Sequence, residues 1–184
     1  MSSPPERSAE AIEPATLLRN FMRLLIQPVA VVTSRKEEVN FGLTVSSFTS
    51  VSLKPPLILL CVDNNAPSLS SLVEKGEFVL NLLRREQTEL SDIFAGRRRT
   101  KNKFETVQFS LGQESNMPIL HGTIGYLECK IREKFNGGDH VILMSEIVGG
   151  ATTTGSPLLY HDQSYGTQRY SCPTCERPFA AFPE

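Results

Sequence analysis

The sequence predicts a mainly β domain with a few short helices. Runs of apolar and β-branched residues, each about the length of one strand, recur between residues 29 and 160 and are bounded by Gly, Pro, Asn or Asp. Residues 14–25, 67–75 and 86–94 instead place apolar side chains at the three- and four-residue spacing of an amphipathic helix. With 184 residues, the chain has the length of a single domain with its own hydrophobic core.

The charges nearly cancel, since 19 Lys and Arg residues and 20 Asp and Glu residues leave a net charge of −1. Such a chain exerts no overall attraction on nucleic acid or on an anionic membrane. The sequence contains no apolar run of about 20 residues, which a membrane-spanning helix needs, and its first residues lack the apolar core of a signal peptide. We therefore expect a cytoplasmic protein that binds neither nucleic acid nor membrane.

The first half of the chain reads as a mobile tail over residues 1–13, a helix that starts at Pro14 and ends before Pro28, and a buried strand over residues 29–33. The charged residues 35–38 predict a solvated hairpin turn. Strands are also expected at 57–62 and 77–83.

Residues 40–56 are the most informative stretch, because they are rich in hydroxyls and uncharged until Lys54. Gly42 permits close backbone approach or a positive φ. From Val45 to Leu53 apolar and hydroxyl side chains roughly alternate, which predicts a strand with two different faces, and Pro55 and Pro56 force an extended exit. A strand pair of this kind suits a flat heterocycle that carries a phosphate. The alternative is a Ser- and Thr-rich outer strand.

Two further segments could contact an anion. Asp63, Asn64 and Asn65 predict a turn before a short helix that ends at Gly76, and Ser68 would lie in its first turn, either as a cap or as an anion contact. Five of the seven residues 97–103 are cations, and they follow a helix that ends at Gly96. This block is either a solvated loop or a phosphate clamp, with nucleic acid a weaker third interpretation because the block is single.

The second half predicts a long strand from Met117 through Ile131, a hairpin turn at 136–139 and a returning strand over 141–148. His140 would stand at the mouth of that strand. Residues 158–160 are expected to form the last strand, with His161 and Tyr165 in the loop that follows.

The cysteines do not indicate a disulfide framework. Cys61 and Cys129 lie in apolar runs and are expected to be buried thiols. Cys172 and Cys175 form a Cys-Pro-Thr-Cys motif, which is half of a four-ligand zinc site. Three interpretations stay open for this pair: an exposed dithiol without function, a metal site completed by His161 or across a dimer, and a redox pair.

The stretch from Gly42 to Asp63 resembles the core signature of the short-chain flavin reductases. Three later stretches fit the same family in order, namely Phe94-Ala95-Gly96, Gly137-Gly138-Asp139-His140, and Pro157 to His161 with Tyr165. The resemblance runs from about Phe21 to Tyr165. It implies a Greek-key-like, FMN-binding split β-barrel with short flanking helices over residues 14–166, followed by a tail over 167–184. It also implies a homodimer that reduces FMN, or FAD, with NADH or NADPH.

The resemblance further implies which residues form the site. The expected flavin-binding residues are Gly42, Thr44, Val45, Ser46, Ser47, Phe48, Asp63, Asn64, Asn65, Ser68, Ala95, Gly96, Arg97, Lys101 and Lys103. His140, His161 and Tyr165 are expected to flank the nicotinamide, and His140 is the candidate catalytic residue. No metal ligand is expected, with Cys172 and Cys175 as weak candidates.

The sequence thus predicts an NAD(P)H-dependent flavin reductase that supplies reduced flavin to a partner monooxygenase. The hydride would pass between two stacked rings, so the protein would supply orientation more than an acid or a base. Two alternatives remain, a flavin-binding electron carrier without free reductase activity and a structural protein that has lost the ligand.

Overall fold

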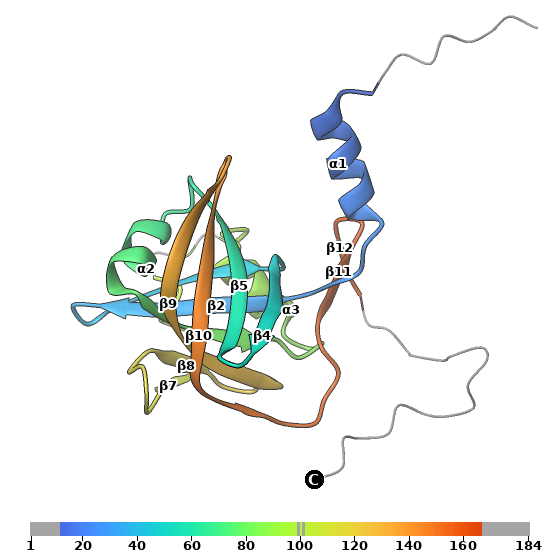
Figure 1. Cartoon of the computed structure of the whole chain (residues 1–184). Helices are drawn as coiled ribbons and strands as arrows, with labels where there is room; N and C mark the ends of the chain where they lie inside the picture. Colours follow the sequence, from blue (N-terminus) through green and yellow to red (C-terminus); the bar gives the residue numbers. More distant parts are fainter. Residues whose placement is uncertain (1–11, 99, 101, 167–184) are drawn as a thin grey trace, which may run out of the picture.

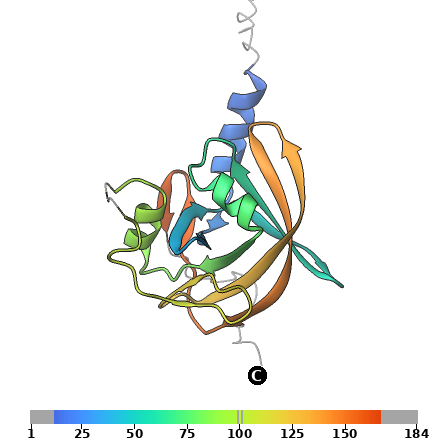
Figure 2. The same ribbon diagram turned by 90° about the vertical axis from the view of Figure 1, so that its left-hand side faces the viewer.

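The main body of the protein is one curled, antiparallel sheet (Figures 1 and 2). The computed structural model describes residues 12–98, 100 and 102–166. The sheet has seven strands, in the spatial order β3 (Val39–Val45), β2 (Ala30–Lys36), β6 (Glu77–Leu82), β9 (Gly125–Gly137), β10 (His140–Thr152), β5 (Pro56–Asp63) and β4 (Phe48–Leu53). The prediction of a mainly β domain is confirmed.

The two edges of this sheet, β3 and β4, follow one another in the chain and are joined by Ser46 and Ser47. The predicted strand over Val45 to Leu53 is therefore interrupted, because the chain leaves one edge at Val45 and starts the other at Phe48. The amide of Cys61 on β5 donates a hydrogen bond to the carbonyl of Ser47, at 2.9 Å. This hydrogen bond ties the loop between the two edge strands to β5.

The core inside the sheet follows from the period of two along each strand. On β5, Ile58, Leu60 and Val62 are buried, whereas the residues between them are partly exposed. The helix α2 (Leu69–Lys75) covers this core with the buried Leu72 and ends at Gly76, where φ is 74°. A positive φ favours glycine at that position. Cys129 lies in the same core, as predicted, and burial raises the pKa of its thiol to about 12. Cys61 is only half-buried.

A second core cluster lies under α3 (Thr88–Phe94). Phe94 and Phe104 meet edge to face, with ring centroids 5.2 Å apart, and both side chains are buried. Such aromatic pairs stabilise a core beyond the area that they bury. The residue after α3, Ala95, leads to Gly96 at a φ of 73°, which ends the helix where the sequence predicts.

Two predicted strands are corrected by the smaller sheets. The expected strand from Met117 to Ile131 is two strands, because Gly122 adopts a φ of 76° in a turn between β8 (Pro118–Leu120) and β9. β8 pairs with β7 (Phe109–Leu111). β11 (Leu159–His161) does not join the barrel sheet but pairs with β1 (Gln27–Pro28) and β12 (Ser164–Gly166). His161 and Tyr165 therefore lie in strands, whereas the sequence predicted both in a loop.

The N-terminal helix α1 (Pro14–Arg23) projects away from the curled sheet (Figure 1). Glu13 caps it by accepting hydrogen bonds from the amides of Ala15 and Thr16, and the helix ends at Arg23, several residues earlier than predicted. Its apolar side chains remain uncovered, since Leu17 is 56% exposed and Phe21 is 57% exposed. The predicted apolar stripe is present but has no partner within the described part of the chain.

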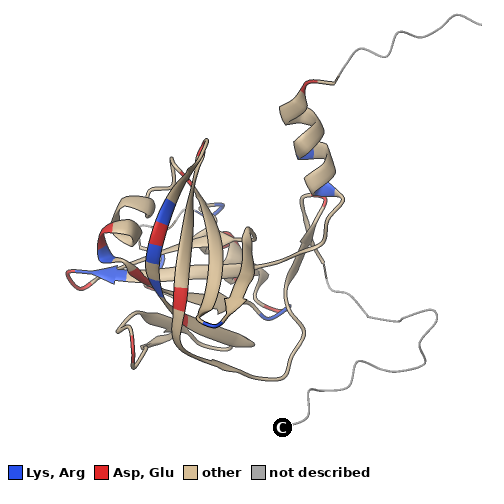
Figure 3. Ribbon diagram, in the orientation of Figure 1, with Lys and Arg blue, Asp and Glu red and all other residues tan. Residues whose placement is uncertain are grey.

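Basic and acidic residues lie close together along β9 (Figure 3). On β9, Lys130 lies 3.7 Å from Glu77, and Arg132 pairs with Glu146. Of the residues that the structure describes, none forms a helix long and apolar enough to cross a membrane.

Candidate flavin site

Residues from three of the four family-like stretches meet in one hollow of about 500 Å³, which we call the cradle. Its walls are β3 with the loop after it, the end of β5, the segment before α2, and the end of α3. The lining residues are Leu43, Thr44, Val45, Ser46, Ser47, Cys61, Val62, Asp63, Ala66, Pro67, Ser68, Phe94, Ala95, Gly96, Lys103 and His140. The volume lies in the range of about 300–1,000 Å³ that is typical of small-molecule sites.

The hydroxyl protons of the cradle are already used by the protein. Thr44 Oγ1 donates to the carbonyl of Ser91, at 2.7 Å, and Ser46 Oγ donates to Oε1 of Gln27, at 2.9 Å. Ser47 Oγ donates to the carbonyl of Cys61, at 2.8 Å. A hydroxyl that has given its proton still has lone pairs that can accept a hydrogen bond. These side chains therefore offer acceptors to a ligand, such as the imide N–H of an isoalloxazine ring.

Of the cations that the structure describes, Lys103 places its amine inside the cradle. It donates to the carbonyls of Phe94, at 3.0 Å, and of Gly42, at 3.3 Å. Burial lowers the pKa of Lys103, because desolvation disfavours the charged form. Ser68 Oγ approaches the same Gly42 carbonyl at 3.5 Å. An amine and a hydroxyl that converge in this way can hold a phosphate.

Gly42 is required by the packing next to this amine. A Cβ atom on Gly42 would lie 2.5 Å from Cε1 of Phe94, which is closer than real Cβ contacts come. The absence of a side chain therefore lets α3 approach β3. This close approach sets the position of the backbone carbonyls that hold Lys103.

Arg97 lies in a smaller hollow of about 170 Å³ beside the cradle, with Tyr160 and Tyr165. Its guanidinium donates to both tyrosine hydroxyls, at 3.2 Å each, and pairs with Asp92 at 3.3 Å. The hydrogen bond to Tyr160 is the main cause of a raised Arg97 pKa. The two hollows share Thr44, Val45, Ser46 and Ala95. Arg97 is thus next to the flavin site but held by the C-terminal hairpin β11–β12.

Tyr165 is held at the same place by several contacts. Its hydroxyl donates to Oδ1 of Asp92, at 2.9 Å, and lies 2.9 Å from Oγ of Ser91. Burial raises the pKa of Tyr165. These contacts fasten β12 to α3.

The residues around the hairpin β9–β10 divide between two places. His140 lines the cradle, and its Nδ1 lies 2.7 Å from Oδ1 of Asp139. This hydrogen bond lowers the pKa of Asp139. Asn64 donates to the carbonyl of Gly138, at 3.0 Å, and faces a different hollow at the end of the barrel.

Several predicted residues are not brought into the cradle. Asn65 donates to the Asp63 carboxylate within the turn, Phe48 lines an apolar hollow under β4, and His161 is exposed at the end of β11. Lys101, Cys172 and Cys175 lie outside the described residues. Conversely, the sequence reasoning missed Leu43, Cys61, Val62, Ala66, Pro67 and Phe94, which line the cradle. The alternation along the strand over 57–62 could have assigned Cys61 to the face of the serines. The position of Phe94 could not be predicted, because only the fold brings α3 against β3.

The chain matches a family model and several known proteins. The family model "Flavin reductase like domain" matches residues 22–169. The flavin reductase (NADH) of Kitasatospora aureofaciens is 31% identical over 169 residues, which cover 90% of this chain and 87% of that protein. The reductase component of a 4-nitrophenol monooxygenase of Rhodococcus opacus is 27% identical over 148 residues, 80% of this chain and 78% of that protein.

A solved structure shows the same fold. The NADH:FAD oxidoreductase of Streptomyces globisporus, in complex with NAD and FAD fragments, superposes with a TM-score of 0.80 at 30% identity and covers 91% of this chain and 100% of that chain. The predicted split-barrel fold is confirmed by this likeness. With its family-model match over residues 22–169, this chain belongs to the flavin reductase like domain family.

Proposed function

We propose that this protein is an NADH-dependent flavin reductase that acts on FMN or FAD. The observation that carries the proposal is the cradle itself, in which hydroxyl acceptors and one half-buried amine converge at the family motif. Relatives with the printed names of NADH-dependent flavin reductases support it. A bound flavin supplies the hydride chemistry.

The residues of the chain would bind the flavin and the nicotinamide and orient their rings. Thr44, Ser46 and Ser47 would accept hydrogen bonds from the ring edge, and Lys103 with Ser68 would hold the phosphate. His140 stands at the rim of the cradle with its ring oriented by Asp139, where it would contact the nicotinamide. Two rings held in contact react faster chiefly because their encounter is no longer bimolecular. No acid or base is needed for that role.

A second copy of the chain belongs to this proposal. Cys61, Ile142 and Phe135 lie side by side on the outer face of the sheet, as do Leu59 and Met144. Phe135 is 45% exposed, and α1 adds a second uncovered apolar surface. Exposed apolar side chains on two elements favour burial against a partner, and Cys61, which also lines the cradle, makes the face continuous with it. A homodimer would cover it, which sedimentation equilibrium of wild type and Phe135→Asp tests.

The names of the relatives suggest which kind of enzyme would use the reduced flavin. The Rhodococcus opacus protein is named as the reductase component of a monooxygenase. We infer that reduced flavin leaves this enzyme for a separate oxygenase, and that the reaction takes place in the cytoplasm, where NADH is available.

The test is an anaerobic assay with NADH and a flavin. The proposal expects oxidation of NADH at 340 nm together with bleaching of the flavin at about 450 nm, at substoichiometric enzyme. Protein that binds FMN tightly but leaves NADH unoxidised would instead be an electron carrier. Protein that takes up neither FMN nor FAD would contradict both readings.

A further inference from the structure

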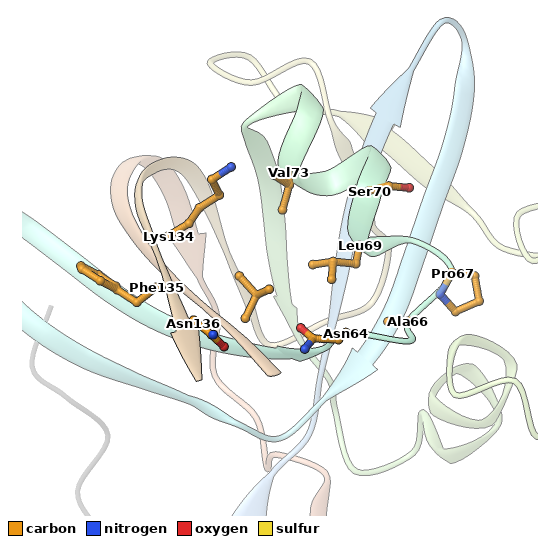
Figure 4. Close-up of a pocket in the computed structure, with 10 residues that line it drawn as sticks. Asn64, Ala66, Pro67, Leu69, Ser70, Val73, Lys134, Phe135 and Asn136 are labelled. Carbon is orange, nitrogen blue, oxygen red and sulfur yellow. The ribbon is translucent and has the colours of Figure 1, made fainter. Parts of the chain in front are cut away.

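A larger hollow, of about 780 Å³, opens at the end of the barrel between α2 and the hairpin β9–β10 (Figure 4). We call it the end hollow and define it by Asn64, Leu69, Val73, Lys134, Asn136 and Val141. Lys134 reaches from the hairpin toward Val73 of α2, whereas the ring of Phe135 points away from the helix (Figure 4). The proposed function has no role for this hollow so far.

The floor of the end hollow is apolar. Leu69, Val73 and Val141 pack against the barrel core and are only partly buried. Three aliphatic side chains that are supported from below but open above suit the face of a flat, weakly polar ring. Covering them would release water from apolar surface.

Two amides at the rim offer complementary hydrogen bonds. The NH2 group of Asn64 donates to the carbonyl of Gly138, at 3.0 Å, and among the described residues its Oδ1 has no partner and can accept. The Oδ1 of Asn136 accepts from the amide of Gly138, at 3.0 Å, and its NH2 group likewise has no partner there and can donate. An acceptor and a donor at one edge match the amino group and ring nitrogen of adenine.

Lys134 supplies the charge. Within the described part of the chain its amine forms no ion pair, although its strand neighbours Lys130 and Arg132 both do. An amine that is not neutralised by a carboxylate can attract a phosphate.

The end hollow adjoins the cradle. Ala66 and Pro67 line both hollows, so the segment that leads into α2 separates the cradle from the end hollow. A ligand with one ring in the cradle could therefore extend past Ser68 into the end hollow. A mononucleotide would fill the cradle alone, but a dinucleotide has a second half to place.

We propose that the end hollow binds the adenosine 5′-phosphate half of a dinucleotide. This inference deepens the proposed function and rests on it. Both FAD and NADH carry that half, so the same contacts could bind either dinucleotide. Experiment decides which of the two places its adenosine in the end hollow.

The direct test is a titration of the full chain with AMP, in which NMR or calorimetry measures the affinity. Lys134→Ala should weaken AMP binding about three- to tenfold, as expected for loss of one partly exposed charged contact. Lys130→Ala is the matched control, because Lys130 lies on the same strand but outside the hollow. Equal AMP affinity in wild type and Lys134→Ala would overturn the proposal.

Kinetics then identify the source. If the half belongs to FAD, Lys134→Ala raises KM for FAD about three- to tenfold and leaves KM for FMN unchanged. If it belongs to NADH, KM for NADH rises and KM for reduced nicotinamide mononucleotide does not. Equal effects on mononucleotides and dinucleotides would contradict an adenosine site.

The two proposals can fail separately. Wild type that reduces no flavin, with AMP binding that still depends on Lys134, would end the reductase proposal and leave the end hollow intact. Normal reduction of FMN, with every KM unchanged in Lys134→Ala, would end the inference about the hollow and leave the reductase.

Discussion

The hydroxyl of Ser47 donates a hydrogen bond to the carbonyl of Cys61, at 2.8 Å, and the amide of Cys61 donates to the carbonyl of Ser47, at 2.9 Å. This reciprocal pair joins the loop between the two edge strands to β5. It also orients the Ser47 oxygen so that lone pairs, and not the proton, are left for a ligand. The same residue pair therefore fixes the loop against β5 and makes the Ser47 hydroxyl a hydrogen-bond acceptor in the cradle.

Replacing Ser47 by Ala should weaken FMN binding. The variant loses one acceptor for the flavin and the bond to Cys61, so we expect a loss of about 0.5–1.5 kcal/mol in binding free energy. Fluorescence titration of apo-protein with FMN measures it. Ser110→Ala, an exposed position on β7, should bind FMN as wild type does. Unchanged affinity in Ser46→Ala and Ser47→Ala alike would remove both side chains from the site.

Replacing Lys103 by Met should reduce affinity for FMN but not for riboflavin. The amine lies inside the cradle, and its loss would leave the phosphate without its cation, which we expect to cost about tenfold in Kd. Arg98→Met is the control from the same basic block, since Arg98 is exposed and pairs with Glu89 at 3.5 Å. If both variants lose the same affinity, the block acts as a diffuse field and not through one clamp.

The affinity for FMN should fall at alkaline pH. Burial lowers the pKa of Lys103 from its ordinary value of 10.5, so in the free protein the amine loses its proton at a lower pH than an exposed lysine. Protonated Lys103 binds the phosphate dianion, and binding therefore weakens as pH rises through that lowered pKa. Titrations of FMN and riboflavin between about pH 7 and pH 10 compare the two. Lys103→Arg should flatten the FMN profile, because guanidinium stays charged; a profile that falls equally for riboflavin would exclude Lys103 as the cause.

Replacing Gly42 by Ala should destabilise the fold and the cradle together. The new methyl group would lie 2.5 Å from the Phe94 ring, so α3 must shift, and overpacking of this kind costs about 1–3 kcal/mol. Thermal melts and FMN titration of the variant measure both effects. Gly166→Ala is the matched control, because a Cβ atom there meets nothing within 4 Å. A Gly42→Ala variant as stable as wild type would show that α3 can retreat freely.

Much of the architecture is local and could be read from the chain. Short apolar runs bounded by Pro, Gly, Asn and Asp predicted the strands, and the helices end at Gly76 and Gly96 as predicted, each at a positive φ. The prediction failed where pairing partners matter. An apolar run does not say which sheet it will join, so residues 158–160 were expected to form a barrel strand, whereas β11 pairs with β1 outside the main sheet.

By itself, the sequence determined the mainly β class, the hydroxyl-rich stretch after Gly42 and the family to which the chain belongs, because these depend on residue types at fixed spacing. Tertiary structure alone decided which cations reach the cradle: Lys103 enters it, whereas Arg97 is held by Tyr160 and Tyr165 from a hairpin more than 60 residues later in the chain. It also decided that the serine protons point into the protein and that the apolar side chains of α1 are uncovered within the described part of the chain. Such outcomes depend on contacts between distant segments, whose geometry exists only after the chain has folded.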